Sequence, residues 1–333
     1  MAASTPLPIS APRGWLRRLA SLWLTAALIA WLLGAVAWAF EFDRPATWSL
    51  VGPLGGLFVN LAAAVASNPV FRRQTALLVF HLALMAVVLL IAVGRLTYMK
   101  GRMELTTGLE YAGTLVQHDA GPLHPWHLER AAFVSEGFDI EYAPGLKRGH
   151  TRNPVRWIDE DGQSRRAVIG DQDALILHGY RFYTSSNKGY SARMAWQPAG
   201  GGIMRGVLNF PPYPVFQYGQ SLDWTPEGSR VPLKLHLKLP ETLLPFDRAT
   251  AFALPKDHTL AIEGAGEPAT LRPGDTLPVA GGVLVYEGLT TWMGYSIHYD
   301  WTLPWLTAAA FLACAALGWH FWRKFAARPW QPE

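Results

Sequence analysis

The chain has 333 residues, of which 50% are hydrophobic and only 16% are charged. Soluble domains usually carry about 25% charged residues, and the deficit here falls in long uncharged stretches. The net charge of +4 is modest and its basic residues flank those stretches, so no nucleic-acid binding is expected. The single cysteine, Cys314, excludes an intrachain disulfide, a CxxC thiol pair, a CxxCH haem attachment site and a cysteine zinc cluster.

Four uncharged segments are each long enough to cross a membrane, which takes about 20 apolar residues at 1.5 Å rise per residue. Three of them are strong candidates: residues 19–40, 75–93 and 303–322. The fourth, residues 48–66, is thinned by Pro53 and three glycines, and a re-entrant or interfacial segment remains the alternative there. Residues 19–40 exceed the 7–15 residues of a signal-peptide core, so we predict an uncleaved anchor.

Basic residues predict the orientation, because Lys and Arg concentrate on the cytoplasmic side of membrane spans. Three basic clusters precede the first span, separate the second from the third, and follow the fourth. They are Arg13, Arg17 and Arg18; Arg72 and Arg73; and Arg323, Lys324 and Arg328. The loop between the first two spans has only Arg44, against Glu41 and Asp43. With four spans all three clusters share one side, which predicts a multi-pass protein of the bacterial inner membrane with both termini cytoplasmic.

Residues 98–302 then lie in the periplasm and are predicted to form one large all-β domain, a sandwich or barrel of antiparallel strands. Residues 231–239, VPLKLHLKL, alternate apolar and polar side chains, as a half-buried strand does. Residues 155–170 contain a DEDG turn between two short strands, a hairpin pattern. Residues 174–186 and 281–289 have the aromatic and β-branched content of strands. The predicted plan is a three-span region at 1–97, the β domain at 98–302, and a final span with its tail at 303–333.

The predicted β domain contains no recognisable catalytic motif, and we do not expect the protein to be an enzyme. No nucleophile elbow, Walker loop or HExxH motif occurs. His124 and His127, in HPWH, form its only close histidine pair. No third metal ligand is placed by the sequence, so a surface loop is the favoured interpretation and a metal site the alternative.

The membrane region contains two ionisable side chains, His81 and His320, and such residues are functional hypotheses by default. His81 lies six residues past Thr75, about 9 Å into the bilayer at 1.5 Å per residue. A haem iron would satisfy one of its ring nitrogens; a hydrogen bond to a neighbouring helix, for example to Asn60, is the alternative. His320 lies near the end of the last span, where it can reach the interface instead of binding a cofactor.

Several segments, in their order and spacing, resemble the ResB/CcsB family of the second cytochrome c maturation system. The pair Phe80-His81 with the following GRLTYMKGRMELTTG is similar to that family's third span and the strand after it. LHGYRFYTSSNKGYSARMAW and GYSIHYDWTLPWLTAAAFLACAALGWHFW resemble a later strand and the approach to the last span. The chain is short for the family, and Asp300-Trp301-Thr302-Leu303-Pro304 replaces the family's usual Asp-Pro-Gly.

The resemblance implies a non-catalytic accessory subunit that handles haem b. In that family the subunit pairs with a CcsA-type haem-handling membrane protein, and the pair presents haem to apocytochrome c. His81 then corresponds to a haem ligand on the cytoplasmic side, whereas His320 has no such counterpart. Two alternatives stay open: a haem-free membrane scaffold whose β domain binds a partner, and a b-type electron carrier using His81 and His320. Gly52, Gly55 and Gly56 would let a partner helix approach closely, or would pack inside the four-span bundle.

Overall fold

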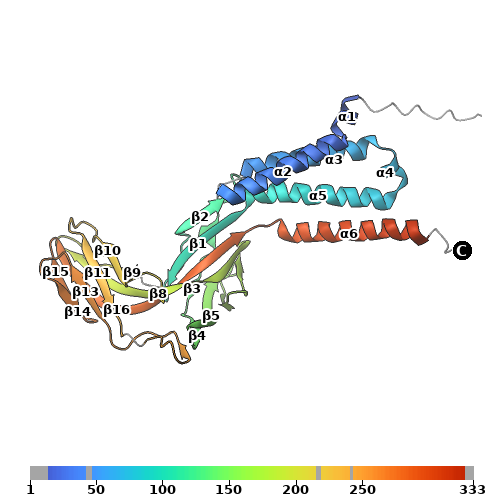
Figure 1. Cartoon of the computed structure of the whole chain (residues 1–333). Helices are drawn as coiled ribbons and strands as arrows, with labels where there is room; N and C mark the ends of the chain where they lie inside the picture. The colour runs from blue at the N-terminus through green and yellow to red at the C-terminus, as the bar shows by residue number, and fades with distance from the viewer. Residues whose placement is uncertain (1–13, 43–46, 215–218, 241–242, 327–333) are drawn as a thin grey trace, which may run out of the picture. The chain divides into compact units, whose positions relative to one another are not determined.

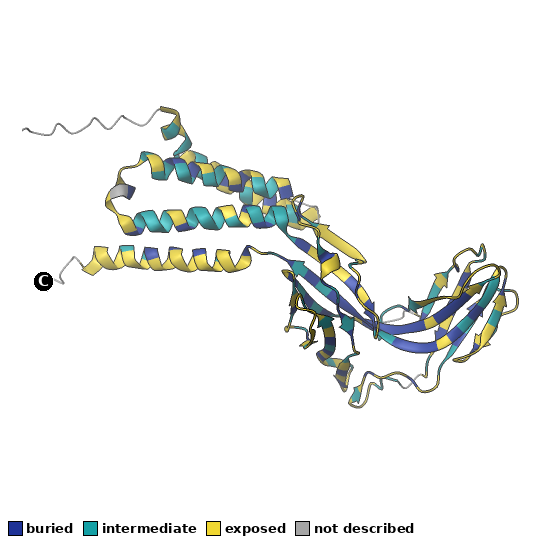
Figure 2. Ribbon diagram, turned by 180° about the vertical axis from the view of Figure 1, so that it is seen from behind, coloured by how far each residue is buried: buried dark blue, intermediate teal, exposed yellow. Residues whose placement is uncertain are grey.

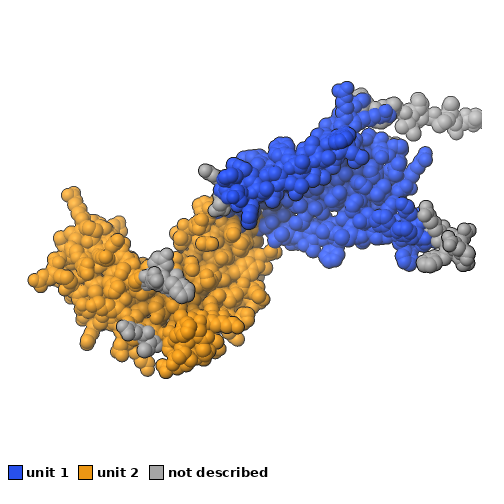
Figure 3. Space-filling view, viewed as in Figure 1, with its two compact units in different colours: residues 1–99, 119–125, 300–333 blue, residues 100–118, 126–299 orange. Residues whose placement is uncertain are grey.

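The computed structural model describes residues 14–42, 47–214, 219–240 and 243–326, with every side chain in them except that of Arg72. Arg13, Asp43, Arg44 and Arg328, which entered the orientation argument, lie outside the described residues. The chain divides into two compact units (Figure 3). Unit 1 comprises residues 1–99, 119–125 and 300–333, and unit 2 comprises residues 100–118 and 126–299.

The helices belong to unit 1 and follow the uncharged segments of the sequence (Figure 1). They are α1 (Gly14–Leu19), α2 (Leu22–Phe42), α3 (Thr47–Ser67), α4 (Val70–Arg73), α5 (Thr75–Thr97) and α6 (Leu303–Ala326). Over the described ranges, α2, α3, α5 and α6 are long and apolar enough to span a membrane, which confirms the four predicted segments as candidate spans. Figure 2 shows α6 as largely exposed, and exposed apolar surface of this extent favours a lipid environment.

The weakest predicted span, α3, is a continuous helix of 21 residues that runs through Pro53. Its glycines permit close packing on α2. A Cβ at Gly52 would lie 3.2 Å from the Trp31 ring, and one at Gly56 would lie 2.6 Å from Leu28. These two glycines therefore pack within the helical unit, whereas Gly55 has no neighbouring atom within 4 Å of a Cβ.

Asn60 is the buried polar residue that ties the start of α2 to α3. Its side-chain amide donates to the carbonyls of Leu19 at 2.5 Å and Ser21 at 3.2 Å, and its Oδ1 accepts from Thr25 Oγ1 at 2.7 Å. Leu19 ends α1 and its carbonyl accepts from Asn60, whereas the Ser21 carbonyl also accepts from the backbone N–H of Thr25.

The long strands β8 (Tyr180–Pro198) and β16 (Gly282–Tyr299) run antiparallel along almost their whole length. Their sheet has the order β2–β1–β16–β8–β7, and β15 pairs with β16 and β9 with β8. The bounds are β1 (Met99–Thr106), β2 (Gln117–Ala120), β7 (Leu175–Leu177), β9 (Met204–Asn209) and β15 (Thr276–Val279). The predicted segment 281–289 begins β16, whereas the predicted segment 174–186 is divided between β7 and the start of β8 by a turn.

Two further sheets complete the strands of the described chain. One has the order β10–β11–β13–β14: β10 (Ser221–Trp224), β11 (Leu233–Lys238), β13 (Thr259–Glu263) and β14 (Ala269–Leu271). The other has the order β12–β4–β5–β3, with β6 also on β5: β3 (Val134–Ser135), β4 (Asp139–Ala143), β5 (Lys147–Ile158), β6 (Ser164–Ile169) and β12 (Thr250–Ala251). The predicted hairpin is β5 and β6, and the predicted alternation is β11, whose residues alternate strictly between buried and exposed.

Unit 2 is β-rich, with the short 3-10 helix η1 (Leu128–Arg130) as its one helical segment among the described residues. Its core contains fully buried aromatic side chains. The ring centroid of Phe133 lies 5.2 Å from that of Phe182 and 5.7 Å from that of Tyr295, in edge-to-face contact. Tyr295 donates its hydroxyl to Oδ1 of the buried Asn153 at 2.5 Å, which links β16 to β5.

Candidate functional site

His81 lies on α5 and is half-buried, with Phe71 and Phe80 packed edge-on at centroid distances of 4.6 and 5.1 Å. Its Nδ1 is 2.8 Å from the carbonyl oxygen of Leu77, one turn earlier in the same helix. A carbonyl only accepts, so Nδ1 carries the proton, and the neutral ring keeps a lone pair on Nε2. No hydrogen bond to Nε2 is formed within the described part of the chain. The imidazole is therefore oriented with one nitrogen available to a ligand.

The predicted alternative, a hydrogen bond between His81 and Asn60, is wrong. The Asn60 side chain is instead hydrogen-bonded to Leu19, Ser21 and Thr25. His320 lies elsewhere in unit 1, half-buried on α6. It lines a cavity of about 410 Å³ together with Arg73, Arg323 and Lys324 and the first residues of α5. His81 is not among the lining residues, so this cavity does not unite the two histidines.

The HPWH segment does not form the metal site that was the alternative interpretation. In the ranges that the structure describes, no three His, Cys, Asp or Glu residues are grouped to hold a metal ion. His124 is buried, so the surface-loop interpretation is also wrong for it, and its Nδ1 lies 2.9 Å from the carbonyl oxygen of Thr97, the last residue of α5. Nε2 of His127 lies 3.1 Å from the carbonyl oxygen of His178. His124 thus caps the helix that carries His81.

A second polar site, which the sequence did not reveal, lies at an irregularity between β8 and β16. Thr184 pairs with Tyr295 and Lys188 with Met293, so the three residues Ser185, Ser186 and Asn187 stand opposite Gly294 alone. A Cβ at Gly294 would lie 2.7 Å from Ser185 Oγ and 3.0 Å from the Asn187 carbonyl oxygen. Such bulges bend a sheet and often lie beside functional sites.

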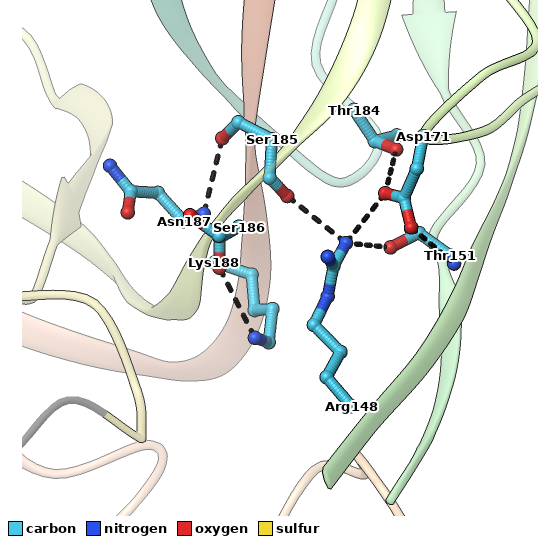
Figure 4. A network of polar contacts seen from close by, with 8 residues as sticks. All are labelled: Arg148, Thr151, Asp171, Thr184, Ser185, Ser186, Asn187 and Lys188. Carbon is cyan, nitrogen blue, oxygen red and sulfur yellow. Dashed lines mark hydrogen bonds and ion pairs between the residues drawn. The ribbon is translucent and has the colours of Figure 1, made fainter.

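Beside this bulge, Arg148 of β5 forms an ion pair with Asp171, with Nη2 2.6 Å from Oδ1 (Figure 4). The same nitrogen donates to the Thr151 hydroxyl and to the Ser185 carbonyl, and Thr184 Oγ1 donates to Asp171 at 2.9 Å. Burial alone would raise the pKa of Asp171, but the hydrogen bonds from Arg148 and Thr184 hold it below its ordinary value. Asp171 is therefore an ionised carboxylate at neutral pH.

Lys188 is the second cation of this site, and it is only 4% exposed. Its Nζ donates to the Ser186 carbonyl at 3.2 Å and lies 5.3 Å from the centre of the Tyr142 ring. Burial, and then the charge of Arg148, lower the pKa of Lys188 to about 8 although Asp171 opposes them. The one signal in the sequence was the run Ser185–Ser186–Asn187, which breaks the alternation of β8 and so indicates a bulge.

No protein-family model matches this chain, and no curated protein matches it either.

Proposed function

We propose that this chain is an accessory subunit of the bacterial inner membrane that handles haem during the maturation of c-type cytochromes. The observation that carries the proposal is the His81 side chain, an imidazole within a span-length helix whose Nδ1 is bound to the Leu77 carbonyl. Histidines that ligate metals usually donate their other ring N–H in this way, which fixes the tautomer and orients the ligand nitrogen. The segments around His81 also resemble those of the ResB/CcsB family.

The residues of the helical unit fit haem b in two respects. Bound haem supplies an iron that takes an axial nitrogen, and two propionates that need positive partners. His81 Nε2 would hold the iron. The cavity lined by Arg73, Arg323 and Lys324 has the charge that suits the propionates, and His320 belongs with these cations instead of serving as a second axial ligand.

A CcsA-type membrane protein is the proposed partner, with apocytochrome c as the recipient of the haem. An iron held by His81 would either keep an open position or take a second ligand, and the cavity around His320 does not include His81. Such a second ligand is therefore expected from the partner. We further propose that the β-rich unit is periplasmic and binds the partner or recipient without catalysing a reaction.

The test is the haem content of His81→Ala, with His320→Ala as the matched control inside the same helical unit. Each variant is co-expressed with a CcsA-type partner and purified in mild detergent, and its absorption spectrum gives haem per protein. We expect His81→Ala to lose most of the haem and His81→Gly to regain it when imidazole is added. His320→Ala should keep the Soret band of the parent protein, because iron ligation is intact.

Two outcomes would replace this proposal by one of its alternatives. Absence of haem from the parent protein, both in the complex and alone, favours a haem-free scaffold, whereas parental haem content in His81→Ala refutes ligation by His81. Stoichiometric haem in the isolated chain, lost equally in His81→Ala and His320→Ala, would instead favour a b-type electron carrier.

A further inference from the structure

A cavity of about 570 Å³ lies at the edge of the sheet that contains β4 and β5. Two of the residues that line it, Tyr142 and Arg148, each carry a buried donor with no acceptor. These donors are the hydroxyl of Tyr142, which is 3% exposed as a residue, and Nε of Arg148. Buried donors are almost always paired in folded proteins, so two unpaired donors on neighbouring residues indicate a missing acceptor.

Glu141 and Lys147 also line the cavity, whereas Lys188 and Asp171 lie beside it, so three cations and two carboxylates surround these donors. Lys188 and Arg148 are two cations; burial, and then repulsion by Arg148, lower the pKa of Lys188. Asp171 is the carboxylate that opposes them, and it is held by Arg148, Thr151 and Thr184. In the view of Figure 4 the Arg148 guanidinium lies between Asp171 and Lys188. The ammonium of Lys188 has one carbonyl acceptor, that of Ser186, and the face of the Tyr142 ring.

We propose that Arg148, Lys188 and Tyr142 form a binding site for a carboxylate. A carboxylate has two oxygens and about four acceptor positions, enough for the Tyr142 hydroxyl, Arg148 Nε and the Lys188 ammonium together. It also adds the negative charge that the pair of cations lacks. Arg148 of β5 reaches the bulge at Ser185–Asn187 of β8, where its Nη2 donates to the Ser185 carbonyl.

Two sources share this chemistry: a free organic acid, and the propionate of a porphyrin. The first source is independent of the haem-handling proposal, whereas the second rests on it. The charged groups that face Lys188 are Arg148 from β5 and Asp171 after β6, with the Tyr142 ring from β4. Because Lys188 loses its proton near pH 8, carboxylate binding should weaken as the pH rises above that value.

The test uses the full chain in detergent and follows thermal unfolding by tryptophan fluorescence. Sodium acetate is compared with sodium chloride at equal ionic strength and pH 7, because a ligand that binds the folded state raises the unfolding midpoint. We expect a saturable increase with acetate. Tyr142→Phe, which removes one hydroxyl and keeps the ring, should weaken acetate binding about ten-fold, the size of one hydrogen bond to an ion. Lys188→Met should abolish the increase.

The matched control is Tyr286→Phe, which removes another buried hydroxyl without an acceptor but lies outside this cavity. It should respond to acetate as the parent does. Equal responses in the parent, Tyr142→Phe and Tyr286→Phe would overturn the proposal, as would the absence of any acetate effect. Should Lys188→Met fail to fold, the comparison of the two tyrosine variants decides.

A second arm separates the two sources. Protoporphyrin IX is compared with its dimethyl ester, which lacks the carboxylates, by quenching of tryptophan fluorescence. Binding of the acid alone, weakened in Tyr142→Phe, assigns the site to a porphyrin propionate. An acetate response without porphyrin binding assigns it to a free acid and leaves the carboxylate site intact, even if the His81 experiment excludes haem.

Discussion

Gly121 offers the sharpest test of how the helix that carries His81 is held at its C-terminal end. The segment 119–125 covers the end of α5 and supplies donors to two of its last carbonyls and to the carbonyl of the capping residue Tyr98. Gly121 N donates to Tyr98 O, Leu123 N donates to Leu96 O, and His124 Nδ1 lies near Thr97 O, each at 2.9 Å. A Cβ at Gly121 would lie 2.2 Å from Leu96 O and 2.7 Å from Arg95 O.

Gly121→Ala should therefore displace the whole segment. The new methyl carbon needs about 3.3 Å from a carbonyl oxygen, so the segment must move by about 1 Å, because the atoms in its way are backbone. Three hydrogen bonds are then lost or stretched, at about 1 kcal/mol each, which predicts a loss of about 3 kcal/mol in the free energy of unfolding. His124→Ala removes one of the three bonds and should cost about 1 kcal/mol.

The assay is thermal unfolding of the purified variants in detergent, followed by tryptophan fluorescence. Gly55→Ala is the matched control, since it is a helical glycine whose Cβ would meet no atom within 4 Å. That variant should be as stable as the parent or slightly more stable, because alanine favours helix over glycine by about 1 kcal/mol. If Gly121→Ala and Gly55→Ala unfold at the same temperature, the segment does not clamp α5 and the reasoning fails.

Two further predictions concern single buried polar groups. Asn60→Leu should lower the free energy of unfolding by about 2 kcal/mol, because three hydrogen bonds within the helical unit disappear at about 0.6 kcal/mol each and the Leu19 carbonyl loses its side-chain donor. An unfolding midpoint equal to that of the control Val59→Leu would contradict the role of Asn60 as a cap. Lys188 has a folded-state pKa of about 8 against an ordinary 10.5, so between these values the unfolded chain binds more protons and stability rises with pH. In chloride buffers without carboxylates, the free energy of unfolding should rise by up to ~1.4 kcal/mol per pH unit between about pH 8 and 9.5. This rise should be absent in Lys188→Met.

The helices were predictable because their signal is local. In lipid, an uncharged run of about 20 residues forms a helix, because a helix pairs the backbone N–H and C=O groups within the run itself. This holds wherever the run occurs in the chain. The same is true of β11, where alternation within six residues already separates a buried from an exposed face, and of the β5–β6 hairpin, whose turn residues are adjacent. His81 could be proposed for the same reason, since an ionisable residue in an apolar run is visible in the sequence without its partner.

The tertiary structure alone decided which distant groups meet. Arg148, Asp171 and Lys188 come from separate parts of the chain, and each by itself reads as an ordinary solvated residue of a strand or turn. They meet because β6 pairs with β5, and because Arg148 of β5 reaches both Asp171 and the bulge of β8 opposite Gly294. These contacts join residues far apart in sequence. His124 was likewise assigned to the surface from its motif, whereas the open carbonyls at the end of α5 draw it into the helical unit.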